Sequence, residues 1–358
     1  MRKRVAAGVG FAALLFLLVQ LGALALVPTF YEQGYQTVED PSDPTNSLVY
    51  IGAILVATAL MLAAFKFDLD WIVRGFVVLA AASVAWYVFS VLLPPLAAVG
   101  ASVALAALLV VHPEWYVIDA AGVVMGAGAA GLFGISFGLL PALLLLSVLA
   151  VYDAISVYGT EHMLDLAEGV MDLNLPVVLV VPTTLSYSLA DARSEAIEGE
   201  ADSDDSEDAI DDGEAATDDD EDANVAGDDG ARSDLEEDGN ATVADDAETA
   251  ASDEEDDVRD AFFIGLGDAV IPTVLIASAA FFLPSSLTPS LGVPGLPALT
   301  LPALTAMIGT FAGLFALLWM VLKGRAHAGL PLLNGGAILG YLLGALASGV
   351  PLLTALGL

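Results

Sequence analysis

Runs of apolar residues, separated by short polar or Pro/Gly breaks, make up most of the chain. Nine such runs stand at 5–27, 47–65, 71–93, 95–111, 118–137, 139–158, 261–283, 300–322 and 329–347. About 20 apolar residues are enough to cross a hydrocarbon core of roughly 30 Å as an α-helix. Most runs are apolar on all sides, as expected for helices that face lipid and one another. The pattern therefore predicts an all-α, polytopic membrane protein with nine transmembrane helices.

Two apolar segments need a separate interpretation. The piece from Leu173 to Leu189 is short and interrupted by prolines, and the residues before it place apolar side chains at helical spacing. We therefore interpret 159–190 as an amphipathic extension of the sixth span that lies in the membrane interface without crossing. The first run follows Arg2-Lys3-Arg4 but exceeds the 7–15 apolar residues of a signal peptide, so we expect a retained first span.

The formal charge of −36 comes mainly from one stretch of the chain. Residues 191–260 contain 32 of the 46 Asp and Glu residues and three of the Arg residues. With few large apolar side chains, this stretch cannot offset its ordering entropy by burial, which predicts a disordered loop. It divides the chain into helices one to six (1–158), the interfacial extension, the acidic loop, and helices seven to nine (261–358). Such acidity also suggests a salt-rich cytoplasm, as in a halophilic archaeon.

The basic residues predict the orientation in the membrane. With the N-terminus inside, all ten Lys and Arg residues fall on the cytoplasmic side or at its membrane edge. Short cytoplasmic loops collect such residues. We therefore expect a multi-pass protein of the cell membrane, with a cytoplasmic N-terminus, a cytoplasmic 191–260 loop and an external C-terminus.

Asp153 and Asp268 are the two acidic residues that sit inside apolar runs away from their edges, and no Lys or Arg lies there, since Asp119 and Arg74 fall near the starts of their runs. Each costs about 2.5–3.5 kcal/mol near a helix centre, so each needs compensation. Two aspartates that meet and share one proton provide a neutral acid and an anionic base, which together can hydrolyse an amide. Composition alone favours catalysis and ion coupling in a transporter about equally, and separate hydrogen bonds to neighbouring helices would also account for both residues.

The residues around the two aspartates carry a more specific signal. Tyr152-Asp153 lies in the sixth run and Gly265-Leu266-Gly267-Asp268 in the seventh, with the long hydrophilic loop between them. This order resembles the YD and GxGD motifs of the presenilin and signal peptide peptidase family. The family's third motif, PAL, is imperfect here, because the corresponding residues are Ala328, Gly329, Leu330 and Pro331.

The resemblance implies an archaeal, presenilin-like intramembrane aspartic endopeptidase. In that family Asp153 and Asp268 would be catalytic, while Gly329 and Leu330 would bind an extended substrate through backbone hydrogen bonds. Substrates would be single-span membrane proteins or signal-peptide-like segments within the lipid bilayer. The resemblance implies no cofactor, no metal and no nucleic-acid partner, and it indicates no obligate partner subunit.

Competing chemistries have weaker support. Residues 134–138 match GxSxG, but a nucleophile elbow needs a strand-to-helix turn, and His112, His162 and His327 all fall at span edges. The chain has no cysteine and no His-Glu-x-x-His motif. With the motifs included, the sequence favours the protease, and a proton- or ion-coupled secondary transporter is the alternative.

Overall fold

The computed structural model describes residues 2–67, 69–159, 178–182, 187–188, 261–323 and 328–358. All of them belong to one compact unit, formed by Met1–Ala190 together with Asp260–Leu358. The predicted acidic loop at 191–260 and most of the predicted interfacial extension lie outside the described residues. The conformation of the residues of these two segments that lie outside the described ranges therefore stays a prediction.

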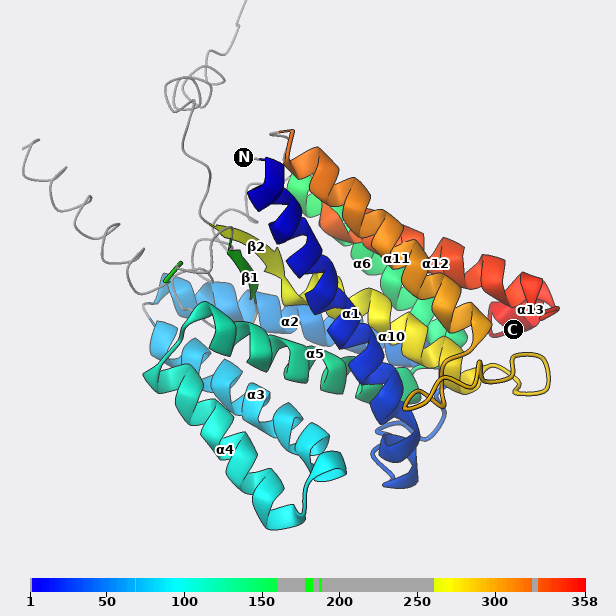
Figure 1. Cartoon of the computed structure of the whole chain (residues 1–358), viewed down its shortest axis with the longest axis horizontal. Helices are drawn as coiled ribbons and strands as arrows, with labels where there is room; N and C mark the ends of the chain where they lie inside the picture. Colours follow the sequence, from blue (N-terminus) through cyan, green and yellow to red (C-terminus); the bar gives the residue numbers. More distant parts are fainter. Residues whose placement is uncertain (1, 68, 160–177, 183–186, 189–260, 324–327) are drawn as a thin grey trace, which may run out of the picture. The chain divides into compact units, whose positions relative to one another are not determined.

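Helices occupy all nine predicted spans (Figure 1). They are α1 (Arg2–Glu32), α2 (Thr45–Lys66), α3 (Asp70–Leu92), α4 (Pro95–Val111), α5 (Trp115–Ser136), α6 (Leu139–Gly159), α10 (Leu266–Phe282), α11 (Leu301–Val321) and α12 (Gly329–Ala347), followed by the short α13 (Leu352–Ala355). Among the described residues, seven helices are long and apolar enough to cross a membrane, whereas α4 and α10 are shorter apolar helices. The helical membrane fold is confirmed, and the exact number of nine crossings stays a prediction.

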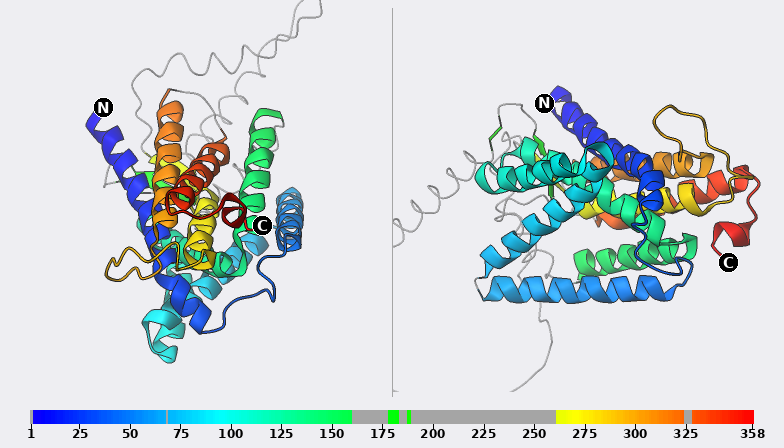
Figure 2. Two further views of the ribbon diagram at one scale, coloured as in Figure 1. Left: turned by 90° about the vertical axis from the view of Figure 1, so that its right-hand side faces the viewer. Right: turned by 90° about the horizontal axis from the view of Figure 1, so that it is seen from below.

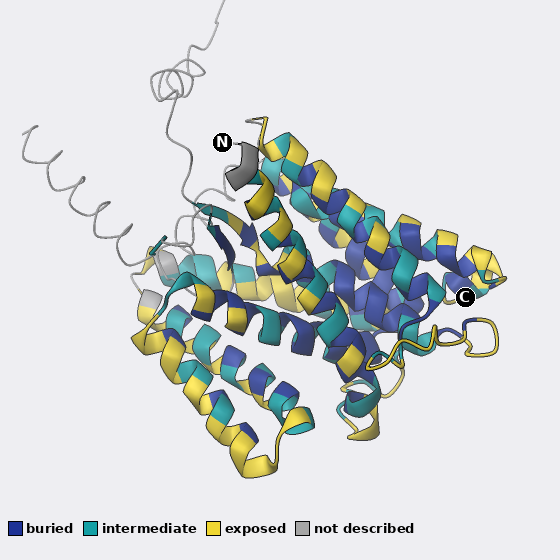
Figure 3. Ribbon diagram, in the orientation of Figure 1, coloured by how far each residue is buried: buried dark blue, intermediate teal, exposed yellow. Residues whose placement is uncertain are grey.

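Helix α10 lies inside the bundle and contacts α1, α5, α6, α11 and α12. Figure 3 shows buried residues concentrated along α5 and α10 and exposed residues along α2 and α4, and many of the exposed ones are large and apolar. Small residues allow this close packing, since a Cβ added at Gly134 of α5 would collide with Ala277 of α10. The helix that carries Asp268 is therefore held by neighbours on several sides.

Helices α11 and α12 pack side by side, as Figures 1 and 2 show. Glycines make the approach possible, because a Cβ added at Gly309 would collide with the carbonyl of Gly336, and one added at Gly336 would collide with Gly309. This packing fixes α12 against the rest of the C-terminal half.

A two-stranded antiparallel sheet corrects two sequence predictions. Strand β1 (Val178–Pro182) pairs with β2 (Ala261–Gly265), with Val180 opposite Phe263. The sequence had assigned 178–182 to the interfacial extension and 261–265 to the start of the seventh span. The β-branched residues of β1 and the aromatic and β-branched residues of β2 favour strands, and the pairing satisfies backbone groups that a short apolar segment would otherwise leave free.

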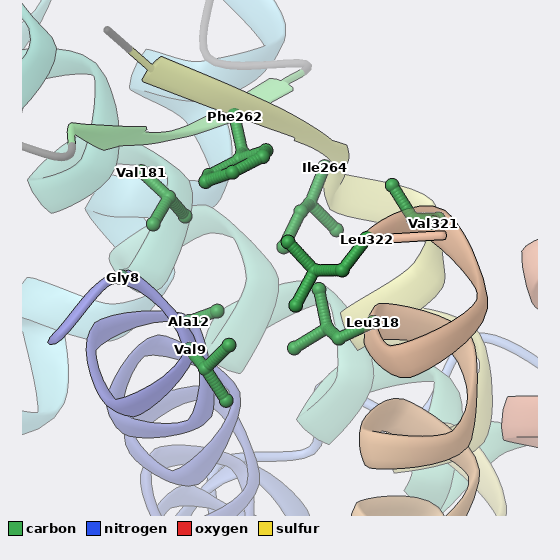
Figure 4. A pocket seen from close by; sticks show the side chains of 9 residues that line it. All are labelled: Gly8, Val9, Ala12, Val181, Phe262, Ile264, Leu318, Val321 and Leu322. Carbon is green, nitrogen blue, oxygen red and sulfur yellow. The ribbon is translucent and has the colours of Figure 1, made fainter. Parts of the chain in front are cut away.

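The sheet packs against α1 and α11. Its side chains and those of the two helices surround an apolar pocket (Figure 4), lined by Gly8, Val9, Ala12, Val181, Phe262, Ile264, Leu318, Val321 and Leu322. Strand β1 also contacts α5. The sheet is thus fixed to the bundle at the point where α10 begins.

Candidate active site

Asp153 and Asp268 come from two helices that contact each other, α6 and α10. The Asp153 side chain is only 7% exposed, and Asp268 is partly exposed. The two carboxylates are close enough to repel each other when both are ionised. The fold therefore brings the two acids near each other, and their sharing of a proton stays a prediction.

Both carboxylates lie against the Gly329–Leu330 peptide. The backbone N–H of Leu330 donates a hydrogen bond to Asp153 Oδ2 at 3.0 Å, and the Gly329 N–H also interacts with this carboxylate. A Cβ added at Gly329 would lie 3.3 Å from Asp268 Oδ2 and 3.4 Å from its Oδ1. Standard backbone dimensions then put the Oδ2 atoms of the two aspartates within about 10 Å of each other.

Two helix N-termini converge on this pair. Asp268 lies in the first turn of α10, and Asp153 accepts a hydrogen bond from the first turn of α12. The first N–H groups of a helix have no partner within it and carry a partial positive charge. They therefore stabilise carboxylates that have no Lys or Arg partner within the spans. The sequence did not reveal this compensation, because it placed the start of α10 five residues too early.

The GxGD residues connect the sheet to the site. Gly265 ends β2 and is the N-cap of α10. A Cβ added at Gly265 would lie 3.5 Å from Asp268 Oδ2. Leu266 is buried and packs in the core with α1, whereas Gly267 is exposed. Pro272 lies four residues after Asp268 and has no N–H, so the Asp268 carbonyl lacks its usual helical partner.

The remaining motif residues differ in their relation to the pair. Tyr152 is 42% exposed, in contrast to the neighbouring Asp153 on α6, which is buried. Ala328 is the N-cap of α12, and Pro331 occupies the first turn, where a missing N–H is tolerated. Sequence reasoning missed Tyr158, whose hydroxyl accepts a hydrogen bond from the Ala328 N–H at 3.4 Å. A proline at this position, as in PAL, could not make that bond.

The competing serine motif has a structural role in the described chain. Ser136 is 1% exposed, and its Oγ accepts hydrogen bonds from the N–H and the hydroxyl of Thr37. His112, the histidine that the structure describes, instead contacts the hydroxyl of Tyr116. The GxSxG motif therefore joins a loop to α5 and forms no Ser–His pair with His112.

A bundle of apolar helices that brings two aspartates together beside helix N-termini defines a class: polytopic membrane proteins with an embedded carboxylate pair. Comparison with known proteins narrows this class. The family described as signal-peptide peptidase, presenilin aspartyl protease, matches residues 13–215 and 236–350. The chain belongs to this family of intramembrane aspartic proteases, which are hydrolases.

Two solved structures are similar over nearly the whole chain. Both are of a presenilin family intramembrane aspartate protease, one in space group C222 and one in P2. The first has 27% identity and a TM-score of 0.57, covering 95% of this chain and 99% of the other. The second has 28% identity and a TM-score of 0.54, covering 94% and 96%. No match was found among curated proteins. These comparisons give no support to the transporter alternative.

Proposed function

We propose that Asp153 and Asp268 are the catalytic pair with which this protease hydrolyses a peptide bond inside a transmembrane substrate. The observation that carries the proposal is that both carboxylates lie against one dipeptide, Gly329–Leu330, at the start of α12. In this mechanism the two carboxylates hold one proton between them at working pH, because their mutual repulsion disfavours ionising both. The pair then contains a base and an acid at the same time.

The reaction follows from this shared proton. The anionic carboxylate removes a proton from a water molecule, which attacks the carbonyl carbon of the substrate. The protonated carboxylate gives its proton to the developing oxyanion. The reaction requires that water reach the pair. Because both loss of the shared proton and gain of a second one stop this cycle, we expect a bell-shaped dependence of kcat on pH.

The substrate must be locally extended to be cut, since a helix hides its carbonyls in hydrogen bonds. We propose that Ala328, Gly329, Leu330 and Pro331 position the extended segment. Gly329 supports this role, since the absence of a side chain leaves its backbone close to the Asp268 carboxylate. Single-span membrane proteins and signal-peptide-like segments fit this mode, because each presents one helix that can unwind at its end.

The orientation proposed from the basic residues puts the N-terminus and the 191–260 loop in the cytoplasm and the C-terminus outside. The active site then lies toward the cytoplasmic end of α6 and α10. A multi-pass location in the cell membrane and a salt-rich archaeal cytoplasm complete the proposal. Cysteines introduced into this cysteine-free chain, at either terminus, and labelled from one side of sealed vesicles would test the orientation.

The decisive experiment compares cleavage of a generic single-span substrate in detergent by the wild type, Asp153→Ala and Asp268→Ala. We expect each substitution to lower kcat by about a hundred- to ten-thousandfold. Asp43→Ala is the matched control, because Asp43 lies outside the spans before α2 and is exposed. Thermal unfolding of all four proteins separates lost chemistry from lost fold. Activity that survives either active-site substitution in a folded protein would refute the proposed pair.

A further inference from the structure

A third aspartate, Asp119, is buried inside the bundle. It lies in the second turn of α5 and is 3% exposed, which is less than Asp153. The sequence pattern had put it at the edge of the fifth span, where an acid needs little explanation. Inside an apolar bundle such a residue is costly unless it makes a specific contact.

Asp119 contacts the sheet. Its Oδ1 accepts a hydrogen bond from the backbone N–H of Val180 in β1 at 2.7 Å. Its Oδ2 is buried and has no hydrogen-bond partner within the part of the chain that the structure describes. The contact with Val180 is therefore the compensation that the described structure offers for this buried acid.

The register of the sheet shows which edge of β1 Asp119 occupies. Val180 is opposite Phe263, and its N–H goes to Asp119 instead of to β2. In an antiparallel pair such a residue points both of its backbone polar groups away from the partner strand. Asp119 thus binds the outer edge of β1. Pro182, two residues further along the same edge, has no N–H to offer.

The sheet is joined directly to the catalytic helix. Gly265 is both the last residue of β2 and the N-cap of α10, and Asp268 follows three residues later. A shift of β1 along α5 would carry β2 with it, because the two strands are paired along their whole length. Such a shift would then move the first turn of α10 relative to Asp153 on α6.

We propose that Asp119 is a positioning residue of the active site. By accepting the Val180 N–H it fixes the sheet on α5, and through β2 it sets the place of Asp268 relative to Asp153. This inference rests on the proposed proteolytic function. It assigns to the Asp119 carboxylate the role of a hydrogen-bond acceptor, so an amide oxygen at the same place serves equally well.

The test uses variants that remove the acceptor, keep it, or remove the donor. Asp119→Leu removes the acceptor at similar volume, and Asp119→Asn keeps it. Val180→Pro removes the donor, and since this N–H takes no part in the strand pairing, a proline is tolerated there. Ser47→Ala is the matched control, because it loses another buried hydrogen bond between helices, from Ser47 to the Pro141 carbonyl. Cleavage of the single-span substrate is followed by mass spectrometry of the products, together with kcat, KM and thermal unfolding.

We expect Asp119→Leu and Val180→Pro each to lower kcat about ten- to a hundredfold and to spread cleavage over neighbouring bonds, because a small misplacement of reacting groups is costly. The double variant should be no worse than either single one, since both remove the same bond. Asp119→Asn and Ser47→Ala should cut the wild-type bonds at near wild-type rate. A change in cleavage position is an effect that lower stability by itself does not produce.

Several results would overturn the proposal. One is a folded Asp119→Leu variant that cuts the same bonds at the wild-type rate, and another is an Asp119→Asn variant that behaves like Asp119→Leu. If Asp119→Leu and Val180→Pro both fail to fold, the bond serves stability alone and the positioning role is also rejected. Failure of the proposed function is distinct, because then the wild type cuts nothing or the Asp153→Ala and Asp268→Ala proteins still cut.

Discussion

The backbone N–H of Leu330 donates a hydrogen bond to Asp153 Oδ2 at 3.0 Å, so the first turn of α12 is joined to the acid on α6. The residue before it, Gly329, lies against the other acid, Asp268. One dipeptide therefore contacts both aspartates. Small changes at the start of α12 should consequently alter catalysis without altering the fold.

Gly329→Ala tests this relation most directly. The new methyl group would lie 3.3 Å from both Asp268 Oδ2 and Leu317 Cδ2, which is tighter than an ordinary contact. The carboxylate must move by a few tenths of an ångström, so we expect kcat to fall about three- to tenfold. Gly335→Ala, in the same helix, is the control, since a Cβ there meets nothing within 4 Å. An unchanged kcat in Gly329→Ala would contradict the proposed contact.

Tyr158→Phe tests how the start of α12 is held without the proline of PAL. The variant loses the 3.4 Å hydrogen bond from the Ala328 N–H, and we expect kcat/KM to fall about two- to fivefold. Ala328→Pro removes the same N–H, but the proline ring fixes φ of residue 328 near the observed −61°. The backbone before α12 is then held rigid without the hydrogen bond to Tyr158. Tyr158→Phe should then have no effect in the Ala328→Pro background. Equal effects of Tyr158→Phe in both backgrounds would show that the bond to Ala328 is unimportant.

Asn334→Ala tests a second link between α12 and α6. The Asn334 side chain is fully buried, and its Nδ2 donates a hydrogen bond to the Leu146 carbonyl at 2.9 Å. Removing this bond and leaving a small cavity should lower the free energy of unfolding by about 1 to 3 kcal/mol. Denaturant unfolding in detergent measures the change. No loss of stability would mean that packing against α11 suffices to hold α12.

Gly335 and Gly336 are adjacent in α12, and substituting each of them tests how closely α12 packs against α11. A Cβ at Gly336 would collide with Gly309 of α11, whereas one at Gly335 meets nothing within 4 Å. We expect Gly336→Ala to destabilise the protein by about 1 to 3 kcal/mol through overpacking. Gly335→Ala should be neutral or slightly stabilising, because alanine favours a helix over glycine. Thermal unfolding of the two variants compares them, and similar stabilities would argue against close packing at Gly336.

The sequence predicted the helices well because a bilayer requires long apolar segments with internal backbone hydrogen bonds. The strands were missed because Val178–Pro182 and Ala261–Gly265 are short apolar segments next to predicted helices, and only their pairing distinguishes them. The two central aspartates could be found, since an acid in an apolar run is rare. Asp119 was missed because its place one turn inside α5 depends on a helix start that sequence does not define.

The acidic stretch offers a final prediction about stability and salt. It is part of the connection 183–260 between Pro182 and Ala261, which are paired in the sheet. Replacing residues 191–257 by a short Gly/Ser linker shortens the loop that folding must close and should stabilise the protein by about 1 to 2 kcal/mol. Cleavage should persist, because no residue proposed for the site lies in this stretch.

The 32 acidic residues of 191–260 repel one another, and salt screens that repulsion over about 10 Å at 0.1 M and 3 Å at 1 M. The stability of the wild type should therefore fall as salt is lowered, and that of the shortened protein should fall less. Thermal unfolding of both proteins between 0.1 and 2 M KCl measures the difference. Equal salt dependence would place the salt-sensitive charges elsewhere in the chain, and loss of cleavage in the folded, shortened protein would make the stretch part of the catalytic machinery.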